Sequence, residues 1–573
     1  MNTSTKKGVI QRIAYLLSPK EKRSFNQIVL WLSLRVIFDL ASIASLLPLI
    51  LSYFKPEILR TNKLWLNITS FLGVELERTT AILILFVAFF FLIKFIYFYI
   101  IEKRKAHFLT KTQHRLVVEV YDNIQSIVMT DFSHYNTGHS LENIAQVPSK
   151  YVFQCLATIL RIIPNAITIT LILLSLVLFQ WKIFLIVCLV FVPILILYLL
   201  SLKRPIKKVE QSFSRLNPVF LQRVAEALTG RIEIALFQKG DFFRKRIEES
   251  SKELMKTTAR LLTLSNSAPY FLELISITGI GVFFYYITTT EFTPEKSITI
   301  LSVFILSIAK IIPSLNGIVS ASTNLKAYIY TVDLLKNIIS KEAQEGKPVR
   351  NVGADITFKG EIKFDNVSVK YPESDFTLPE ISIILKPTDK LAVVGESGSG
   401  KSTILKLMLK LVPANSGSIT VDGKLLDDIE SQNWWSQVAY VPQSSFIFSG
   451  TLLENLTFGK QLSTSERKDI VLLLHELKLQ SLLSSRSDGL DSVIEENGLN
   501  LSTGQRQRIG IARAILQNKL IYVFDEATGG LDESTSAEIM DSLIEGYLKN
   551  RLCVFATHDL LVKSKCTQVL NLS

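Results

Sequence analysis

The sequence predicts an α-helical membrane domain of six long helices with cytoplasmic extensions, followed by an α/β domain with a phosphate-binding loop. Apolar residues make up 48% of the 573 residues and charged residues only 20%, below the roughly one quarter typical of soluble chains. The apolar residues gather in long runs in the first part of the chain. In the later part, short β-branched runs alternate with helical patterns, which is typical of an α/β domain.

Six apolar segments have a length of about 20 residues, which is enough to cross a bilayer core as a helix. They lie near residues 27–54, 79–101, 157–179, 182–202, 270–289 and 297–316. Six crossings place both ends of the chain on one side of the membrane. The first segment exceeds a signal-peptide core in length and contains Arg35 and Asp39, so no cleaved signal peptide is expected.

The distribution of charge predicts which side that is. Six Lys and Arg against Glu21 alone precede the first segment, and the stretch 203–269 carries fourteen Lys and Arg against seven Asp and Glu. Because basic residues favour the cytoplasmic side, the N-terminus and the α/β domain are expected in the cytoplasm, as in a multi-pass protein of a bacterial inner membrane. This bias accounts for much of the net charge of +12, so membrane lipids are expected partners and nucleic acid is not.

Two further stretches, 102–156 and 203–269, mix charged and apolar helix formers with almost no Gly. They are interpreted as helices that continue into the cytoplasm, joined by turns at 135–144 and 228–243; ordinary solvated loops are the alternative. The composition turns polar around 330–355. The expected division is therefore a membrane domain over 1–329, a linker over 330–355 and an α/β domain over 356–573. The four cysteines show neither CxxC nor metal-ligand spacing, which predicts buried thiols rather than disulfides or zinc.

The run KLAVVGESGSGKST, Lys390–Thr403, places GxxxxGK[ST] between an apolar strand and a helical pattern. Glycines in such a loop let backbone N–H groups surround phosphate oxygens, and the helix N-terminus adds its positive dipole end. Lys401 is expected to reach the β- and γ-phosphates of ATP, and Ser402 to place a hydroxyl on Mg²⁺. The residues expected to contact ATP here are Gly395, Glu396, Ser397, Gly398, Ser399, Gly400, Lys401, Ser402 and Thr403.

The run LIYVFDEAT, Leu520–Thr528, is an apolar strand that ends in two carboxylates. An acidic pair at a strand end is more often a solvated turn. Together with a phosphate-binding loop it predicts the second half of a nucleotide site, in which Asp525 holds Mg²⁺ through water. Glu526 would orient or deprotonate the water that attacks the γ-phosphate.

Just before that strand, LSTGQRQRIGIARAI (Leu501–Ile515) resembles the LSGGQ signature of ABC transporters. Tyr371 resembles the A-loop aromatic that stacks on adenine, Gln443 the Q-loop glutamine and His558 the switch histidine. GGLD at 529–532 occupies the D-loop. Six membrane segments before one such domain resemble an exporter-type half-transporter, so the α/β domain is expected to be a P-loop ATPase.

The resemblance implies a dimer with a second half-transporter, most simply a homodimer, in which two ATP domains pack head to tail. Each ATP then lies between the phosphate-binding loop of one chain and the signature of the other, where Ser502, Gly504 and Gln505 contact it. The turns between the cytoplasmic extensions become coupling helices. The implied catalytic residues are Glu526, His558, Gln443 and Asp525, and the implied Mg²⁺ ligands are Ser402, Gln443 and Asp525.

Three departures from the family pattern stand out. Thr503 replaces a signature glycine, Gly529 and Gly530 replace the usual small D-loop pair, and Ser573 follows His558 by only fifteen residues, so the family's closing hairpin and tail are expected to be absent. Because Glu526 and His558 are present, a hydrolytically competent site is expected.

Basic residues at membrane depth bear on the substrate. Arg35, Lys94, Arg161 and Lys310 lie within or near apolar segments, where charge is costly. They predict either a polar cavity for an anionic, pyrophosphate-like head group or local pairing, such as Arg35 with Asp39.

The N-terminal run LLSPKEKRSF is similar to the lipid-linked oligosaccharide flippase branch of the family. The leading expectation is ATP-driven export or flipping of an amphipathic, lipid-linked saccharide. The alternatives are a peptide, toxin or drug exporter and, from another class, a membrane-tethered regulatory ATPase.

Overall fold

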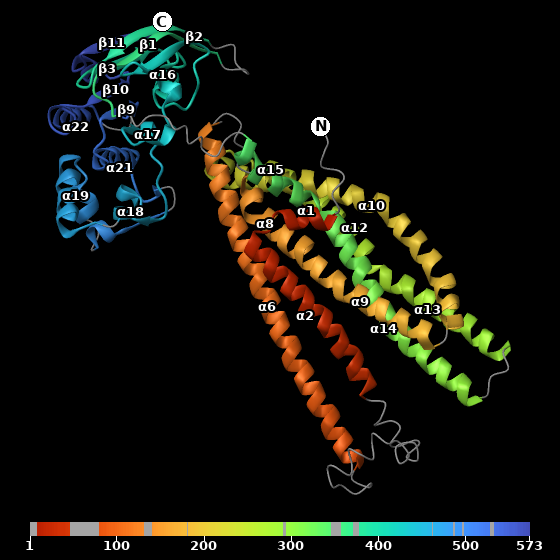
Figure 1. Cartoon of the computed structure of the whole chain (residues 1–573). Coiled ribbons are helices and arrows are strands. Elements are labelled where there is room, and N and C mark those ends of the chain that lie inside the picture. Colours follow the sequence, from red (N-terminus) through yellow and green to blue (C-terminus); the bar gives the residue numbers. More distant parts are fainter. Residues whose placement is uncertain are drawn as a thin grey trace. The chain divides into compact units, whose positions relative to one another are not determined.

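A computed structural model gives the conformation of most of the chain (Figure 1). It describes residues 9–45, 79–130, 140–179, 181–289, 294–344, 357–370, 377–460, 462–484, 488–495, 498–527 and 532–572. Two compact units divide the chain, one formed by Met1–Ile127 with His134–Glu345 and the other by Val128–Ser133 with Gly346–Ser573.

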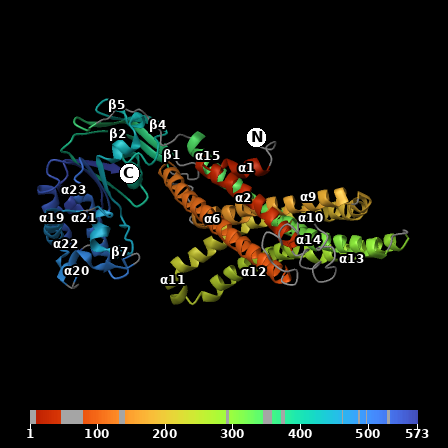
Figure 2. The same cartoon turned by 60° about the horizontal axis from the view of Figure 1, so that its bottom comes forward.

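The described residues of the first unit form helices joined by short turns. Its helices are α1 (Val9–Tyr15), α2 (Pro19–Ala44), α6 (Thr79–Thr130), α8 (Val147–Lys150), α9 (Ala157–Phe179), α10 (Trp181–Thr229), α11 (Arg231–Leu236), α12 (Gly240–Asn266), α13 (Ala268–Thr289), α14 (Pro294–Tyr328) and α15 (Tyr330–Gln344), with π-helical turns η3 (Glu142–Gln146) and η4 (Tyr151–Leu156) on either side of α8. Helices distant in sequence pack together, as α14 with α9 and α2 with α9 (Figures 1 and 2).

The predicted apolar segments lie in long helices, although residues 46–54 of the first segment lie outside the described part. Among the described residues, three helical segments are long and apolar enough to cross a membrane, namely Pro19–Ser42, Leu83–Gln125 and Glu142–Leu178. The number of crossings therefore stays a prediction.

The predicted cytoplasmic extensions are helical where the structure describes them. Helices α6 and α10 continue without a break beyond their apolar segments, and α11 occupies the turn expected at 228–243. Of the other expected turn, residues 135–139 lie outside the described part, and residues 140–144 are helical rather than a turn. Helix α15 fills residues 330–344, where polar composition predicts a linker. It forms because Val332 and Leu335, three residues apart, are both buried against the rest of the unit.

The second unit is an α/β domain. Its parallel sheet has the order β11-β3-β10-β9-β6, an antiparallel sheet has the order β2-β1-β4-β5, and β7 pairs with β8. The strands are β1 (Ile362–Lys370), β2 (Thr377–Leu385), β3 (Lys390–Gly395), β4 (Ser416–Val421), β5 (Lys424–Leu425), β6 (Val438–Val441), β7 (Gly450–Thr451), β8 (Val493–Ile494), β9 (Ile521–Asp525), β10 (Leu552–Ala556) and β11 (Gln568–Leu572).

The helices of this unit cover the sheets and carry its motifs. They are α16 (Lys401–Met408), α17 (Ser431–Trp435), α18 (Leu452–Thr457), α19 (Thr464–Glu476), α20 (Gln480–Ser484), α21 (Thr503–Leu516), α22 (Glu533–Glu545) and α23 (Leu560–Ser564), with 3₁₀ turns η5 (Leu426–Asp428) and η6 (Gly489–Asp491).

The parallel sheet is buried on both faces. Along β9, Ile521 and Val523 pack into the core that contains Trp434, whereas Tyr522 and Phe524 pack into the core formed with α21. Successive strand side chains point to opposite faces, so one nearly continuous apolar run supplies both cores. This rigid sheet holds the loops at its edge.

Candidate nucleotide site

Four functional loops follow neighbouring parallel strands. Strands β3, β10, β9 and β6 lie side by side, so the loops that follow them meet at one edge of the sheet. They carry the phosphate-binding loop, His558, the pair Asp525 and Glu526, and Gln443. Carboxyl ends of parallel strands form the usual ligand crevice of an α/β sheet. The sequence-predicted residues are therefore brought together by topology.

The loop between β3 and α16 has the backbone that phosphate binding requires. Gly398 and Gly400 have φ of +87° and +103°, a region that side chains disfavour. Lys401 is buried, and its Nζ donates to the carbonyl oxygens of Gly395 and Glu396, each at 2.9 Å. The ammonium group is thus held inside the loop where phosphate oxygens would replace these two acceptors.

Asp525 is linked to the start of α16. The Ser402 hydroxyl donates to Asp525 Oδ1 at 3.2 Å, and the Tyr440 hydroxyl donates to Oδ2 at 3.4 Å. Burial, and then the charge of Asp525, raises the pKa of the Tyr440 phenol, so it remains a donor at neutral pH. A hydroxyl beside a carboxylate supplies the oxygen ligands that Mg²⁺ prefers, so these residues fit the ion.

Glu526 is held by two other loops. Its backbone is left-handed, with φ of +46°, and its N–H donates to the carbonyl of Ala556 at 2.9 Å. This turn directs the carboxylate out of the strand, where Gln443 Nε2 donates to Oε2 at 2.7 Å. His558 Nε2 lies 3.4 Å from Oε1. A strained backbone and two polar contacts fix a carboxylate that is about 30% exposed, which suits a group that must reach water.

The signature begins a helix. Ser502 caps α21, with its Oγ accepting the N–H of Gln505 at 3.1 Å while the Gln505 side chain accepts the N–H of Ser502 at 2.9 Å. This capping box leaves the hydroxyl hydrogen of Ser502 for a further acceptor. Gly504 is buried in the first turn, and Thr503 Oγ1 accepts from Arg506 at 3.2 Å.

Some predicted positions lie outside the described residues, namely Tyr371, Gly529 and Gly530. The structure also adds two residues that the motifs do not indicate. Tyr440 touches Asp525 as above, and Gln507 Nε2 donates to the backbone oxygen of Glu526 at 2.9 Å. The sequence holds one signal for Tyr440, because this residue lies in β6, three residues before Gln443.

Comparison with known proteins agrees with this geometry. Residues 378–529 match the model of the ABC transporter family, whose span contains the phosphate-binding loop, the signature and Glu526. Residues 378–529 thus form an ATP-binding domain of the ABC transporter family. In this chain the domain follows a region of long apolar helices.

Two bacterial transport proteins share parts of the sequence of this chain. The lactococcin-G-processing and transport ATP-binding protein LagD of Lactococcus lactis is 32% identical over 353 residues, which is 61% of this chain and 49% of that protein. The ATP-dependent lipid A-core flippase of Neisseria meningitidis is 28% identical over 386 residues, covering 66% of this chain and 60% of the flippase. This chain thus spans about half to three fifths of the length of those relatives.

The likeness in fold extends further. A bacterial Atm1-family ABC exporter with ATP bound superimposes with a TM-score of 0.75 at 18% identity, covering 96% of this chain and 93% of that one. Both units of this chain therefore have the fold of that exporter.

One close approach in the ATP domain gives a prediction. A Cβ on Gly510 of α21 would lie 1.9 Å from Ser445 Oγ, two residues after Gln443. In Gly510→Ala, Ser445 must move, and we expect a loss of about 1–3 kcal/mol in unfolding free energy, as for other overpacked cores. Thermal unfolding measures the loss, and adding Ser445→Gly is expected to restore part of it. Unchanged stability of Gly510→Ala would contradict the close packing.

Two of the four basic residues predicted at membrane depth, Arg35 and Lys94, are paired in the structure. Arg35 contacts Glu102 at 3.1 Å and Asp39 at 4.0 Å, and Lys94 contacts Asp39 at 2.7 Å. Arg161 has no ion pair within the described part of the chain. It lines a cavity of about 490 Å³ between α2, α6 and α9.

Proposed function

We propose that this ABC transporter is one half of an exporter that hydrolyses ATP to move an amphipathic, lipid-linked saccharide across the bacterial cytoplasmic membrane. The proposed ATPase activity rests on the position of the Glu526 carboxylate. Gln443 Nε2 donates to its Oε2 at 2.7 Å, and His558 Nε2 lies 3.4 Å from its Oε1. A fixed carboxylate beside a phosphate-binding loop is suited to orient water for attack on a γ-phosphate.

The surrounding residues have separate tasks in this proposal. Lys401 and the N-terminus of α16 hold the phosphates, while Ser402 and Asp525, with Gln443, hold Mg²⁺. The ion neutralises charge on the β- and γ-phosphate oxygens when bound. Glu526 orients the water and accepts its proton, and His558 supports the carboxylate and the γ-phosphate. Tyr371 would stack on adenine.

The signature is expected to act on the ATP of a second half-transporter. Ser502 has its oxygen engaged by Gln505 N–H, so its hydroxyl hydrogen can be donated to a phosphate across a head-to-tail dimer. Gly504 brings the helix N-terminus of α21 close to that phosphate. ATP would thus join the two domains and hydrolysis would release them. Six membrane crossings, with both ends cytoplasmic, would convert this closure into alternating access.

Arg161 favours an anionic substrate. Its cavity also contains Arg35, Lys105, Asp39 and Glu102, and the two carboxylates already pair with Arg35, Lys94 and Lys105. The excess positive charge at membrane depth fits a phosphate or pyrophosphate group that carries a lipid. The relatives named for lipid A-core flipping agree with such a substrate.

A second candidate is peptide export. It is favoured by the relative named for lactococcin G processing and transport, which has the higher identity, 32%. A membrane-tethered ATPase that regulates a partner is the third, and net transport into liposomes would distinguish it from both exporters.

Stimulation of ATP hydrolysis tests the substrate class. In liposomes, we expect a polyprenyl-pyrophosphate oligosaccharide to stimulate the purified transporter, whereas short peptides do not. In Arg161→Gln we expect the half-maximal concentration to rise about tenfold or more, because one charge-assisted contact contributes roughly 1.5–3 kcal/mol.

The matched control is Arg23→Gln, which removes the same charge from the exposed surface of α2. Selective stimulation by peptides would replace the saccharide by a peptide substrate. An equal loss in both variants would remove Arg161 from the substrate site.

A further inference from the structure

A second cavity, of about 970 Å³, lies between α2 and α6. Its lining includes polar, basic and apolar side chains. Among the basic ones are Lys20 on α2 and Lys103, Arg104 and Lys111 on α6, and the apolar ones are Ile28, Trp31, Ile100 and Phe108. We call this cavity the α2–α6 groove. Arg35 and Arg161, which line the cavity of the proposed substrate, are not part of it.

The positive charge of the groove is not compensated within the described part of the chain. None of Lys20, Lys103, Arg104 and Lys111 takes part in an ion pair there. The guanidinium of Arg104 instead lies 4.2 Å from the centre of the Trp31 ring. Four like charges around one cavity repel one another, so an anion that entered would be favoured.

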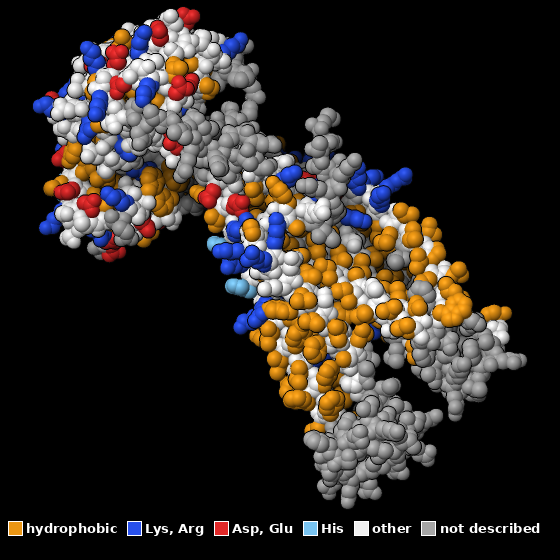
Figure 3. All heavy atoms as spheres, viewed as in Figure 1, with side chains coloured by type: hydrophobic (Ala, Val, Ile, Leu, Met, Phe, Trp, Pro, Cys, Tyr) orange, Lys and Arg blue, Asp and Glu red, His pale blue; other side chains and the backbone are white. Residues whose placement is uncertain are grey.

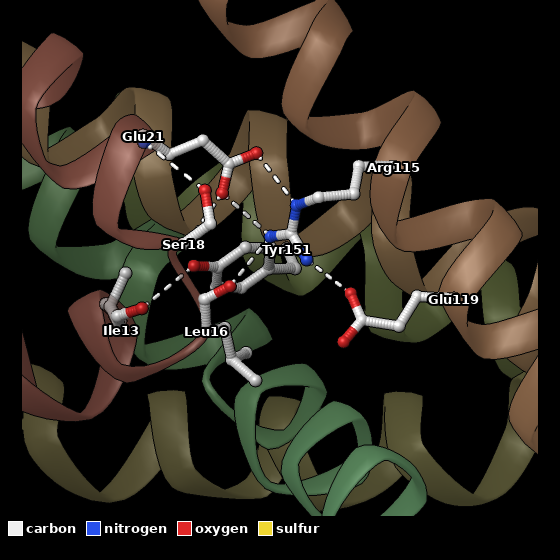
Figure 4. A network of polar contacts seen from close by, with 7 residues as sticks. All are labelled: Ile13, Leu16, Ser18, Glu21, Arg115, Glu119 and Tyr151. Carbon is white, nitrogen blue, oxygen red and sulfur yellow. Dashed lines mark hydrogen bonds and ion pairs between the residues drawn. The ribbon is translucent and has the colours of Figure 1, made fainter.

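The one acidic residue in the groove is already engaged. Glu21 accepts from Arg115 Nε at 2.9 Å and Arg115 Nη2 also donates to the Leu16 carbonyl, while Nη1 contacts Glu119 (Figure 4). Glu21 further accepts the N–H of Ser18 at the start of α2. These contacts fix the end of the groove, and they neutralise Glu21 and Arg115 without reducing the other four charges.

An apolar stripe on α6 leads into the groove. Leu85, Phe89, Leu92, Ile96 and Ile100 follow helical spacing, and each is 44–69% exposed. Arg104 and Lys111 continue the same face beyond Ile100. Figure 3 shows basic side chains gathered on α6 next to its apolar surface. At 1.5 Å per residue the stripe is about 22 Å long, more than half of a ~30 Å hydrocarbon core.

We infer that the α2–α6 groove binds the phosphate head group of an anionic phospholipid of the cytoplasmic leaflet. The four basic residues contact the phosphate, Trp31 and Ile28 contact the glycerol region, and the acyl chains follow the stripe. A basic pocket between helices at the cytoplasmic boundary is suited to such head groups. A soluble anion would gain nothing from the stripe. The inference rests on the membrane orientation of the proposed function and not on its substrate.

Lipid retention tests the groove. The full-length transporter, without nucleotide, is placed in nanodiscs that contain phosphatidylglycerol in phosphatidylcholine, and bound lipid is counted by native mass spectrometry after release. We expect wild type to retain phosphatidylglycerol preferentially. In Lys103→Gln/Arg104→Gln/Lys111→Gln we expect the apparent affinity to fall about tenfold or more, since three cationic contacts are lost.

A matched control changes three basic residues that do not line the α2–α6 groove. Lys203, Arg204 and Lys207 are exposed on α10, just beyond its apolar segment, so their triple Gln variant loses the same charge. We expect it to retain phosphatidylglycerol as wild type does. Equal losses in both variants, or no preference over phosphatidylcholine in wild type, would overturn the inference. As a check on folding, both triple variants must have the elution volume and the unfolding temperature of wild type.

Two further measurements separate the other occupants. Brominated phosphatidylglycerol is expected to quench the Trp31 part of the fluorescence, measured as the difference from Trp31→Phe. Complete competition by soluble glycerol phosphate would make the groove a site for a free anion. Cross-linking of Lys103 to a second half-transporter, with no quenching of Trp31, would make it an interface between chains. Because no nucleotide or saccharide is present, these results are independent of the proposed transport.

Discussion

Glu526→Gln is expected to lower ATP hydrolysis by about 10²–10⁴-fold, the usual contribution of a positioned general base. The amide keeps the shape of the carboxylate and its contact with Gln443 but accepts no proton. ATP affinity is expected to stay near that of wild type, since Lys401, Ser402 and Asp525 are unchanged. The two ATP domains of the proposed dimer should then remain joined. Phosphate release and nucleotide retention measure the two effects separately.

Glu545→Gln is the matched control. It makes the same change at an exposed position at the end of α22, which should leave hydrolysis unaltered. Equal rates in wild type and Glu526→Gln would remove Glu526 from the reaction. A loss of ATP binding in Glu526→Gln would instead assign it to the binding of nucleotide.

Local motifs predict the strand-end loops of this protein well, because each motif lies within a few residues of the strand that positions it. The lateral order of the strands depends on pairing between distant segments. Tyr440 meets Asp525 only because β6 pairs with β9, 85 residues away. The left-handed backbone of Glu526 also has no sequence signal, since glycine would be the usual residue there.

The charges at membrane depth illustrate the same limit. Spacing suggests that Arg35 pairs with Asp39 on its own helix, yet the shorter contacts are Arg35 with Glu102 and Asp39 with Lys94, both across to α6. Helical spacing identifies neighbours on one helix only. Which helices pack together, and so which charge stays without a partner, depends on the tertiary structure.

Lys401→Met is expected to weaken ATP binding at least about 30-fold, because losing one member of a buried charge pair costs roughly 2–5 kcal/mol. Methionine keeps most of the buried stem. Among the described residues the ammonium donates only to the carbonyls of Gly395 and Glu396, and losing these two contacts is expected to cost about 1.5–3 kcal/mol of stability. Titration with a fluorescent ATP analogue measures the affinity, and thermal unfolding measures the stability.

Lys390, at the other end of β3, separates these two effects. It is also buried, and its Nζ donates to the carbonyls of Thr388 and Arg551, at 3.2 and 2.5 Å. Lys390→Met removes contacts of the same kind that are remote from the phosphate-binding loop, so it is expected to cost about 1.5–3 kcal/mol of stability while ATP affinity is kept. If both variants lost affinity in proportion to stability, Lys401 would support the fold rather than the nucleotide. Affinity lost in Lys401→Met alone assigns its ammonium to the phosphates, because burial and backbone contacts are common to both lysines.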